Sequence, residues 1–358
     1  MVGWRRRFGN RRAAGLAALL AMLAWSPVAW AQIGSDRYSS IVIEARGGNV
    51  LSAANPDAPR YPASLTKMMT LYMVFEALRD RRIGLDELVP VSLHAASMSP
   101  TKLGLLPATR ITVEEAILGL VTRSANDAAA ALGEMLGGDE DRFGQAMTLR
   151  ARALGMTQST FRNASGLPDP EQISTARDLA MLARRLITDF PNEYRYFSTP
   201  SFVFHGQTIF NHDMMLQRYP GADGLKTGYT IAAGHNLATS AVRGDVRLIA
   251  VVLGAASNPE RDAHMMALLD QGFERMDVPV AVVHRDVPQG RMSLMASAIA
   301  SPPPLLRRTS IRHGASSEPS RAVSVAISKA TAAPRKEKVA EHGGKAAYHG
   351  CAGPHCPA

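Results

Sequence analysis

The chain has 358 residues, of which 46% are hydrophobic and 20% charged, and its formal net charge at pH 7 is +9. Five arginines lie in the first 31 residues, and eleven Lys or Arg face four Asp or Glu from residue 278 onward, which leaves a net charge near −3 for residues 32–277. Because the basic excess lies outside this region, which is long enough for one large domain, the high charge does not indicate nucleic-acid binding.

The first 31 residues have the layout of a secretory signal peptide. An arginine-rich start precedes an apolar run from Ala13 to about Leu23, and Ala29-Trp30-Ala31 offers a small-residue cleavage site. The apolar run is shorter than the ~20 residues of a membrane-spanning helix. We therefore expect export to the periplasm or cell envelope, with cleavage after Ala31. An uncleaved anchor is the alternative, and Sec and twin-arginine export both stay open.

Apolar patterns predict β-strands at both ends of the central region and helices between them. The strands are expected at 39–45, 48–51, 223–228, 236–242 and 247–253, and the helices at 64–78, 113–122, 127–136, 139–154 and 175–188. Strands that enclose a helical middle favour an α+β fold, in which helices flank an antiparallel sheet and a helical subdomain is inserted.

Three short motifs, in one order and at domain-scale distances, indicate the chemistry. They are Ser64-Leu65-Thr66-Lys67, Ser124-Ala125-Asn126 and Lys226-Thr227-Gly228, and they match the S-x-x-K, S-x-N and K-T-G set of serine acyl-transfer enzymes. Singly, each has a plain structural explanation: a helix cap, a turn and a hairpin signal. Their joint occurrence favours the chemical interpretation.

The residue types suit acyl transfer. Ser64 starts an amphipathic helix, where free backbone N–H groups favour an oxyanion, and Lys67 lies three residues on along the same face. Because a free lysine, with a pKa of ~10.4, is protonated, Lys67 can act as a base only if burial and a nearby positive charge lower its pKa; Lys226 can supply that charge. Ser124 can relay a proton, and Asn126 can orient Lys67 or bind a substrate carbonyl.

The sequence around these motifs resembles the D-alanyl-D-alanine carboxypeptidases, low-molecular-mass penicillin-binding proteins of the serine β-lactamase-like superfamily. The similarity spans roughly residues 36–276 and is carried by 61–70, 124–128, 161–167 and 223–230. It implies a β-lactamase/transpeptidase-like fold that needs no cofactor or metal. It also implies an enzyme that removes the terminal D-alanine of peptidoglycan stem peptides through a Ser64 acyl-enzyme, and that β-lactams acylate as covalent inhibitors.

The resemblance also implies individual roles. Lys67 is matched to the general base, Ser124 to the proton shuttle and Asn126 to a positioning role. The positions matched to binding of the substrate's terminal carboxylate are Lys226, Thr227 and Thr230. The oxyanion hole is matched to the backbone N–H groups of Ser64 and Tyr229. Gly228 has no side chain, so a substrate backbone can approach the strand there.

Two further positions bear on the resemblance. Arg261 falls where the family often has an arginine that helps to hold the carboxylate pocket, and a guanidinium grips a carboxylate with two donors. A surface arginine that pairs with Asp262 is the equally weighted alternative. Ser165 stands where relatives tend to have histidine, which bears on rate or substrate range and leaves the acylation residues intact.

The last segment, residues 278–358, is basic and rich in Pro, Ala and Ser, so we expect a disordered tail. Weak contact with an anionic wall polymer or membrane and a solvated tether without a partner both stay open. Cys351 and Cys356, beside His349 and His355, suggest a short disulfide more than a metal site. The family's second β-rich domain and its amphipathic anchor cannot be assumed.

Three rival functions remain at this point. A β-lactamase shares the fold and motifs, but residues 167–172 lack the Glu-x-x-x-Asn arrangement of one large lactamase class. A D,D-transpeptidase or endopeptidase would use the same residues. A wall-binding or penicillin-sensing protein without turnover belongs to another class, although such proteins usually lose the nucleophile or the base.

Overall fold

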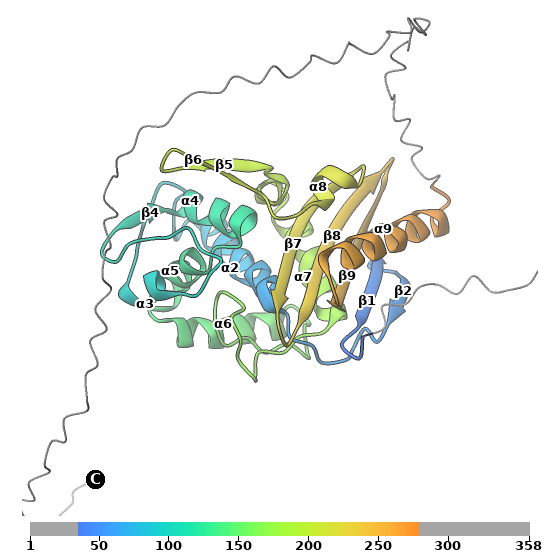
Figure 1. Ribbon diagram of the computed structural model, residues 1–358, viewed down its shortest axis with the longest axis horizontal. Helices are drawn as coiled ribbons and strands as arrows, with labels where there is room; N and C mark the ends of the chain where they lie inside the picture. Colours follow the sequence, from blue (N-terminus) through green and yellow to red (C-terminus); the bar gives the residue numbers. More distant parts are fainter. Residues whose placement is uncertain (1–34, 279–358) are drawn as a thin grey trace, which may run out of the picture. The chain divides into compact units, whose positions relative to one another are not determined.

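The computed structural model describes residues 35–278. The predicted signal peptide lies outside these residues, as does the predicted tail with Cys351 and Cys356, apart from its first residue, Val278. At its centre is a five-stranded antiparallel sheet in the order β2-β1-β9-β8-β7 (Figure 1). The strands are β1 (Ser39–Glu44), β2 (Val50–Ala54), β7 (Ala222–Thr230), β8 (Gly234–Arg243) and β9 (Val246–Ala255). Short connections join β1 to β2 and β7 to β8 to β9, and each of these pairs is antiparallel.

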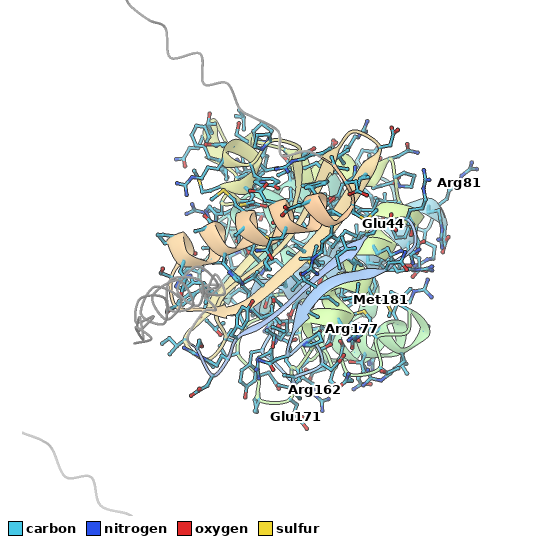
Figure 2. The ribbon with its side chains drawn as sticks, turned by 90° about the vertical axis from the view of Figure 1, so that its right-hand side faces the viewer. Glu44, Arg81, Arg162, Glu171, Arg177 and Met181 are labelled. Carbon is cyan, nitrogen blue, oxygen red and sulfur yellow. The ribbon has the colours of Figure 1, made fainter. Side chains whose placement is uncertain are left out.

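Both faces of the sheet are covered, because successive strand residues point to opposite sides. On β9, Ile249 and Val251 belong to the core shared with α2 (Lys67–Arg79) and α7 (Ala176–Asp189). Leu248 and Val252 belong instead to the core shared with α9 (Asn258–Arg275). Figure 2 accordingly shows α9 on one side of the strands and α7, which carries the labelled Arg177 and Met181, on the other.

A helical region is inserted between β2 and β7. It contains η1 (Ala63–Thr66), α3 (Leu93–Ser97), α4 (Val113–Leu118), the π-helix η2 (Gly119–Arg123), α5 (Asn126–Gly137), α6 (Glu140–Ala153), η3 (Glu193–Ser198) and α8 (Met215–Arg218). Two small ribbons complete it, β3 (Leu88–Pro90) with β4 (Arg110–Thr112) and β5 (Ser201–Phe204) with β6 (Gln207–Phe210). The region brings helices against the free edge of β7 (Figure 1).

The predicted fold class is confirmed, since helices flank an antiparallel sheet and a helical region is inserted into it. The sequence interpretation missed α9, although Ser257 caps it, Pro259 lies in its first turn and Glu260 follows, which is a recognisable start signal. It also missed both small ribbons. Among the described residues no helix has the length and apolar character required to span a membrane.

Candidate active site

The first motif straddles a change of helix type. Ala63 has φ +49° and opens the 3-10 turn η1, and the α-helix begins only at Lys67. The Lys67 side chain is fully buried, and its Nζ lies 3.2 Å from Ser64 Oγ, 2.6 Å from Asn126 Oδ1 and 2.5 Å from the carbonyl oxygen of Ser165. Lys67 is therefore surrounded by three oxygens, of which only the serine hydroxyl can donate a proton.

Two glycines bring other segments against the backbone of Ser64. A Cβ at Gly166, which has φ +83°, would stand 1.9 Å from Ala63 O and 3.0 Å from Ser64 N. A Cβ at Gly228 would also stand 3.0 Å from Ser64 N. The sequence interpretation explained Gly228 by contact with a substrate backbone. In the structure a side chain at Gly228 would point at η1, so the glycine also allows β7 to pack closely against η1.

The second motif lies where η2 ends. Ser124 adopts a left-handed conformation, with φ 59° and ψ 38°, and Asn126 begins α5. Asn126 spans the site, because its Oδ1 accepts from Lys67 while its Nδ2 donates to Ser99 O at 2.8 Å. The buried Ser124 Oγ has no hydrogen-bond partner within residues 35–278, and Ser124 lines the same cleft as Ser64. This hydroxyl is therefore free to bond a ligand.

The third motif lies on β7, the edge strand of the sheet. Lys226 is buried, and its Nζ donates to Thr227 O at 2.9 Å. The neighbouring strand is tied to the segment before the serine by Asn236, whose Nδ2 donates to Tyr61 O at 2.9 Å and to Pro62 O at 3.2 Å while its Oδ1 accepts from Gly254 N at 3.0 Å. Sequence reasoning did not find Asn236, since none of these partners is near it in sequence.

Burial and charge shift the two lysines of the site. Burial, together with the positive charge of Lys226, lowers the pKa of Lys67 well below its ordinary value. Burial lowers the pKa of Lys226 to about 7; the nearby Asp213 opposes this shift and Arg261 adds to it. Desolvation disfavours the ammonium ion in both cases, so burial favours the neutral amine that Lys67 needs to act as a base.

The three motifs border one cleft of about 570 Å³. Eight of the ten predicted site residues line it: Ser64, Ser124, Asn126, Thr227, Gly228, Tyr229, Thr230 and Arg261. The other two, Lys67 and Lys226, are buried and are not among its lining residues. Tyr229 is 56% exposed and stacks on His235, with ring centroids 4.3 Å apart. Thr230 Oγ1 accepts from Ala233 N at 3.0 Å. Within residues 35–278 no three potential metal ligands cluster together.

Arg261 combines features of both interpretations. It is not a surface residue, since only 4% of it is exposed, yet its guanidinium does pair with Asp262, through two nitrogens at 2.9 and 2.6 Å from one carboxylate oxygen. The arginine also lines the same cleft as Ser64. Its position is thus compatible with a contact to a bound anion, and Asp262 holds the guanidinium in place.

Known proteins show clear similarity. The D-alanyl-D-alanine carboxypeptidase family, peptidase S11, matches residues 27–257. The D-alanyl-D-alanine carboxypeptidase DacF of Bacillus subtilis is 34% identical over 271 residues, covering 72% of this chain and 69% of that protein. DacC of Escherichia coli is 38% identical over 245 residues, covering 66% of this chain and 61% of that protein. The chain therefore spans between 61% and 69% of the length of these two relatives.

A solved structure agrees with this assignment. Penicillin-binding protein D2 from Listeria monocytogenes, in its ampicillin-bound form, is 32% identical, with a TM-score of 0.58 over 66% of this chain and 96% of that chain. With a family match over more than half of its length, the chain belongs to the D-alanyl-D-alanine carboxypeptidase family.

Proposed function

We propose that the protein is a serine-type D-alanyl-D-alanine carboxypeptidase, which removes the terminal D-alanine of peptidoglycan stem peptides through an acyl-enzyme on Ser64. The observation that carries this proposal is the set of contacts around Lys67 Nζ. A neutral amine has two N–H donors and one lone pair. Asn126 Oδ1 and the Ser165 carbonyl accept the two donors, so the lone pair faces Ser64 Oγ, as a general base requires.

In the first step Lys67 takes the hydroxyl proton while Ser64 Oγ attacks the carbonyl carbon of the penultimate D-alanine. The negative charge that develops on the carbonyl oxygen would be bound by the backbone N–H groups of Ser64 and Tyr229. Ser124, which lines the cleft and whose buried hydroxyl has no partner within residues 35–278, would pass the proton to the departing D-alanine nitrogen. The amide bond breaks, D-alanine leaves, and water then hydrolyses the ester and restores the hydroxyl.

The terminal carboxylate of the substrate would bind at the other end of the cleft. Thr227 and Thr230 line it, the ammonium of Lys226 lies behind Thr227, and Arg261 adds a second positive charge. β-Lactams also carry a carboxylate, and the similar Listeria protein has been solved in an ampicillin-bound form. We therefore include covalent inhibition by β-lactams on Ser64 in the proposal.

A second, smaller cleft adjoins the first. It has a volume of about 240 Å³ and shares Gly166, Leu167 and Thr230 with the main cleft. Its remaining lining is largely apolar and includes Tyr61 and Pro168. Because Ala63, the residue before Ser64, lines it, we propose that it receives part of the stem peptide on the acyl side of the scissile bond.

The β-lactamase alternative is less well supported. In one large β-lactamase class a loop glutamate activates the deacylating water, and the loop after Gly166 offers Asp169 and Glu171 here. Glu171 instead pairs with Arg162 at 2.6 Å, at the periphery of the molecule (Figure 2). Asp169 accepts a hydrogen bond from Glu171 N at 2.8 Å. A transpeptidase, an endopeptidase and a sensor without turnover would use the same site geometry. These functions are distinguished from a carboxypeptidase by the products that each forms from a peptide substrate.

The ends of the chain complete the proposal. We propose that residues 1–31 direct export to the periplasm or cell envelope, that residues 32–277 form the catalytic domain and that residues 278–358 form a tail with weak affinity for anionic wall or membrane. Comparing wall and membrane association of the full chain with a version ending at residue 278 tests the tail. Equal association would remove the tail from the proposal.

The function is tested by incubating the mature protein separately with a D-Ala-D-Ala pentapeptide and with a penicillin, followed by mass spectrometry. Release of free D-alanine together with a penicilloyl adduct supports a carboxypeptidase. An adduct without peptide hydrolysis indicates a sensor, and rapid hydrolysis of the lactam indicates a β-lactamase. Product peptides joined to a second amine would indicate a transpeptidase.

A further inference from the structure

A loop carbonyl helps to orient Lys67, and the loop itself must be held in place. The Ser165 carbonyl, 2.5 Å from Lys67 Nζ, lies between α6 and α7, outside any helix or strand of the described residues. A group that orients a catalytic side chain works only when a second set of contacts fixes it in turn. The contacts that fix Ser165 therefore bear on the base.

Ala164, the residue before Ser165, is held by two helices. Its carbonyl oxygen accepts from Thr70 Oγ1 of α2 at 2.7 Å, and its N–H donates to Glu140 Oε1 of α6 at 3.0 Å. Ala164 and Thr70 are both fully buried. Because a buried N–H without an acceptor is costly, the bond to Glu140 fixes this point of the loop backbone against α6.

The Glu140 side chain is itself fixed from its other end. Its Oε2 lies 2.7 Å from His94 Nε2 of α3, and 11% of the Glu140 side chain is exposed against 53% of the His94 side chain. The helix α3 is also tied to α5, since Ser92 Oγ donates to Glu134 Oε1 at 2.9 Å. A continuous set of contacts therefore runs from His94 at the surface, through Glu140 and the loop backbone, to Lys67.

The negative charge of Glu140 does not explain its place beside the base. Burial, followed by the charge of Lys226, lowers the pKa of Lys67. The charges of Asp127 and Glu140 act in the opposite direction, so they oppose the neutral amine that a base needs. The hydrogen bond to Glu140 raises the pKa of His94, so a protonated imidazole offsets part of this charge. What Glu140 offers the site is the position of its acceptor oxygen.

We propose that Glu140 is a positioning residue for Lys67. Its Oε1 fixes the amide of Ala164 and so places the carbonyl of Ser165, which orients the amine of the base. His94 holds the Glu140 side chain in the conformation that this requires. The proposal rests on the proposed function, in which Lys67 is the base of the acylation step. Glu140 is not among the residues that line the cleft, so its effect is exerted through the loop.

Two conservative substitutions separate the position of Glu140 from its charge. Glu140→Gln loses the charge but keeps an oxygen that can accept from Ala164 N, and its amide nitrogen can still pair with a neutral His94. Glu140→Asp keeps the charge but is one methylene shorter, so its oxygen is withdrawn from Ala164 N. We expect Glu140→Gln to be acylated by a penicillin within about threefold of the wild-type rate and Glu140→Asp to be slower by about tenfold. If the charge were the useful property, the order would be reversed.

The acylation rate is measured by intact-protein mass spectrometry over a range of penicillin concentrations. A displaced base lowers the maximal rate, while the concentration that gives half of this rate stays within about twofold, because the lining of the cleft is unchanged. A general loss of folded structure would instead lower the fraction of protein that reacts. Asp141→Asn is the control, since it removes an exposed carboxylate from the same turn of α6, and it should be acylated at the wild-type rate.

Hydrogen exchange of the Ala164 amide tests the contact without any catalytic step. In 15N-labelled protein this amide should exchange roughly tenfold faster in Glu140→Asp than in the wild type, and at the wild-type rate in Glu140→Gln. His94→Ala is the second variant if Glu140→Asp does not fold, because it changes a half-exposed side chain and leaves the acceptor of Ala164 N in place. It frees the outer end of Glu140 and should slow acylation by about threefold.

Acylation of Glu140→Asp at the wild-type rate would overturn the proposal, whether or not the exchange of Ala164 accelerates. A Glu140→Gln protein that is acylated more slowly than Glu140→Asp would overturn it too, as would an equal loss in the Asp141→Asn control. If acylation by penicillin and Ala164 exchange change as expected but wild-type protein releases no D-alanine from a pentapeptide, the proposed function fails while the positioning role of Glu140 stands.

Discussion

The close approach of Gly166 to the segment before Ser64 gives the sharpest mutational test of the site. An alanine Cβ there would stand 1.9 Å from the carbonyl oxygen of Ala63, whereas carbon and oxygen ordinarily approach to about 3.3 Å. The two segments must therefore separate by roughly 1.4 Å. Both partners are backbone, so no side-chain rotation relieves the contact, and Ser64 must move away from Lys67 or the loop must rearrange.

The expected consequence of Gly166→Ala is a large loss of acylation. A misplacement of about 1 Å typically costs about 100-fold in rate, and we expect the second-order rate constant for acylation by a penicillin to fall by that factor. Alanine at φ +83° adds a stability cost of about 1–2 kcal/mol. The rate is measured by intact-protein mass spectrometry at several times after mixing, and stability by urea unfolding followed by circular dichroism.

Gly206→Ala separates the two effects. Gly206 also has a positive φ, +76°, but an added Cβ meets nothing within 4 Å. This variant should therefore share the conformational cost and acylate at the wild-type rate. A folded Gly166→Ala protein that acylates within threefold of the wild type would refute the argument that this contact places the nucleophile.

Three further predictions follow from the contacts of the site. Lys226→Met removes the positive charge beside Lys67 and so raises the pKa of Lys67. Because Lys67 must be neutral to act as the base, the acid limb of the pH profile of acylation should move to higher pH. An acid limb at the wild-type pH would contradict the role of Lys226. Asn126→Ala removes the bond that orients Lys67 Nζ and should slow acylation about 100-fold. It also takes a partner from Ser99 O and from the buried Lys67, so the free energy of unfolding should fall by about 1–3 kcal/mol. Asn236→Ala removes three hydrogen bonds, to Tyr61 O, Pro62 O and Gly254 N, and should cost about 1–3 kcal/mol in urea unfolding; a cost under 0.5 kcal/mol would refute its anchoring role.

Local patterns were sufficient to predict the sheet and most helices. The strands β7, β8 and β9 follow from apolar runs separated by turn residues, and the turn around Gly244 predicts that β8 and β9 are antiparallel neighbours. The helix α9 was missed although its capping residues mark its start. The ribbons β3–β4 and β5–β6 are three or four residues per strand, too short for a periodic signal.

The site was predictable as a set of residues but not as a geometry. The motifs name Ser64, Lys67 and Asn126, and nothing in their spacing places the Ser165 carbonyl at Lys67, because that contact spans 98 positions of the chain. Asn236 is equally invisible, since its role arises from hydrogen bonds to backbone groups distant in sequence. Long-range contacts of this kind are set by packing, which local sequence does not encode.

The most direct test of the central claim is the product of the reaction with a stem peptide. Mass spectrometry of a pentapeptide ending in D-Ala-D-Ala, incubated with wild-type protein and with Ser64→Ala, should show a peptide shortened by one alanine, together with free D-alanine, only in the wild-type sample. An intact peptide after incubation with folded wild-type protein, or the same shortened peptide with Ser64→Ala, would contradict acyl transfer by Ser64.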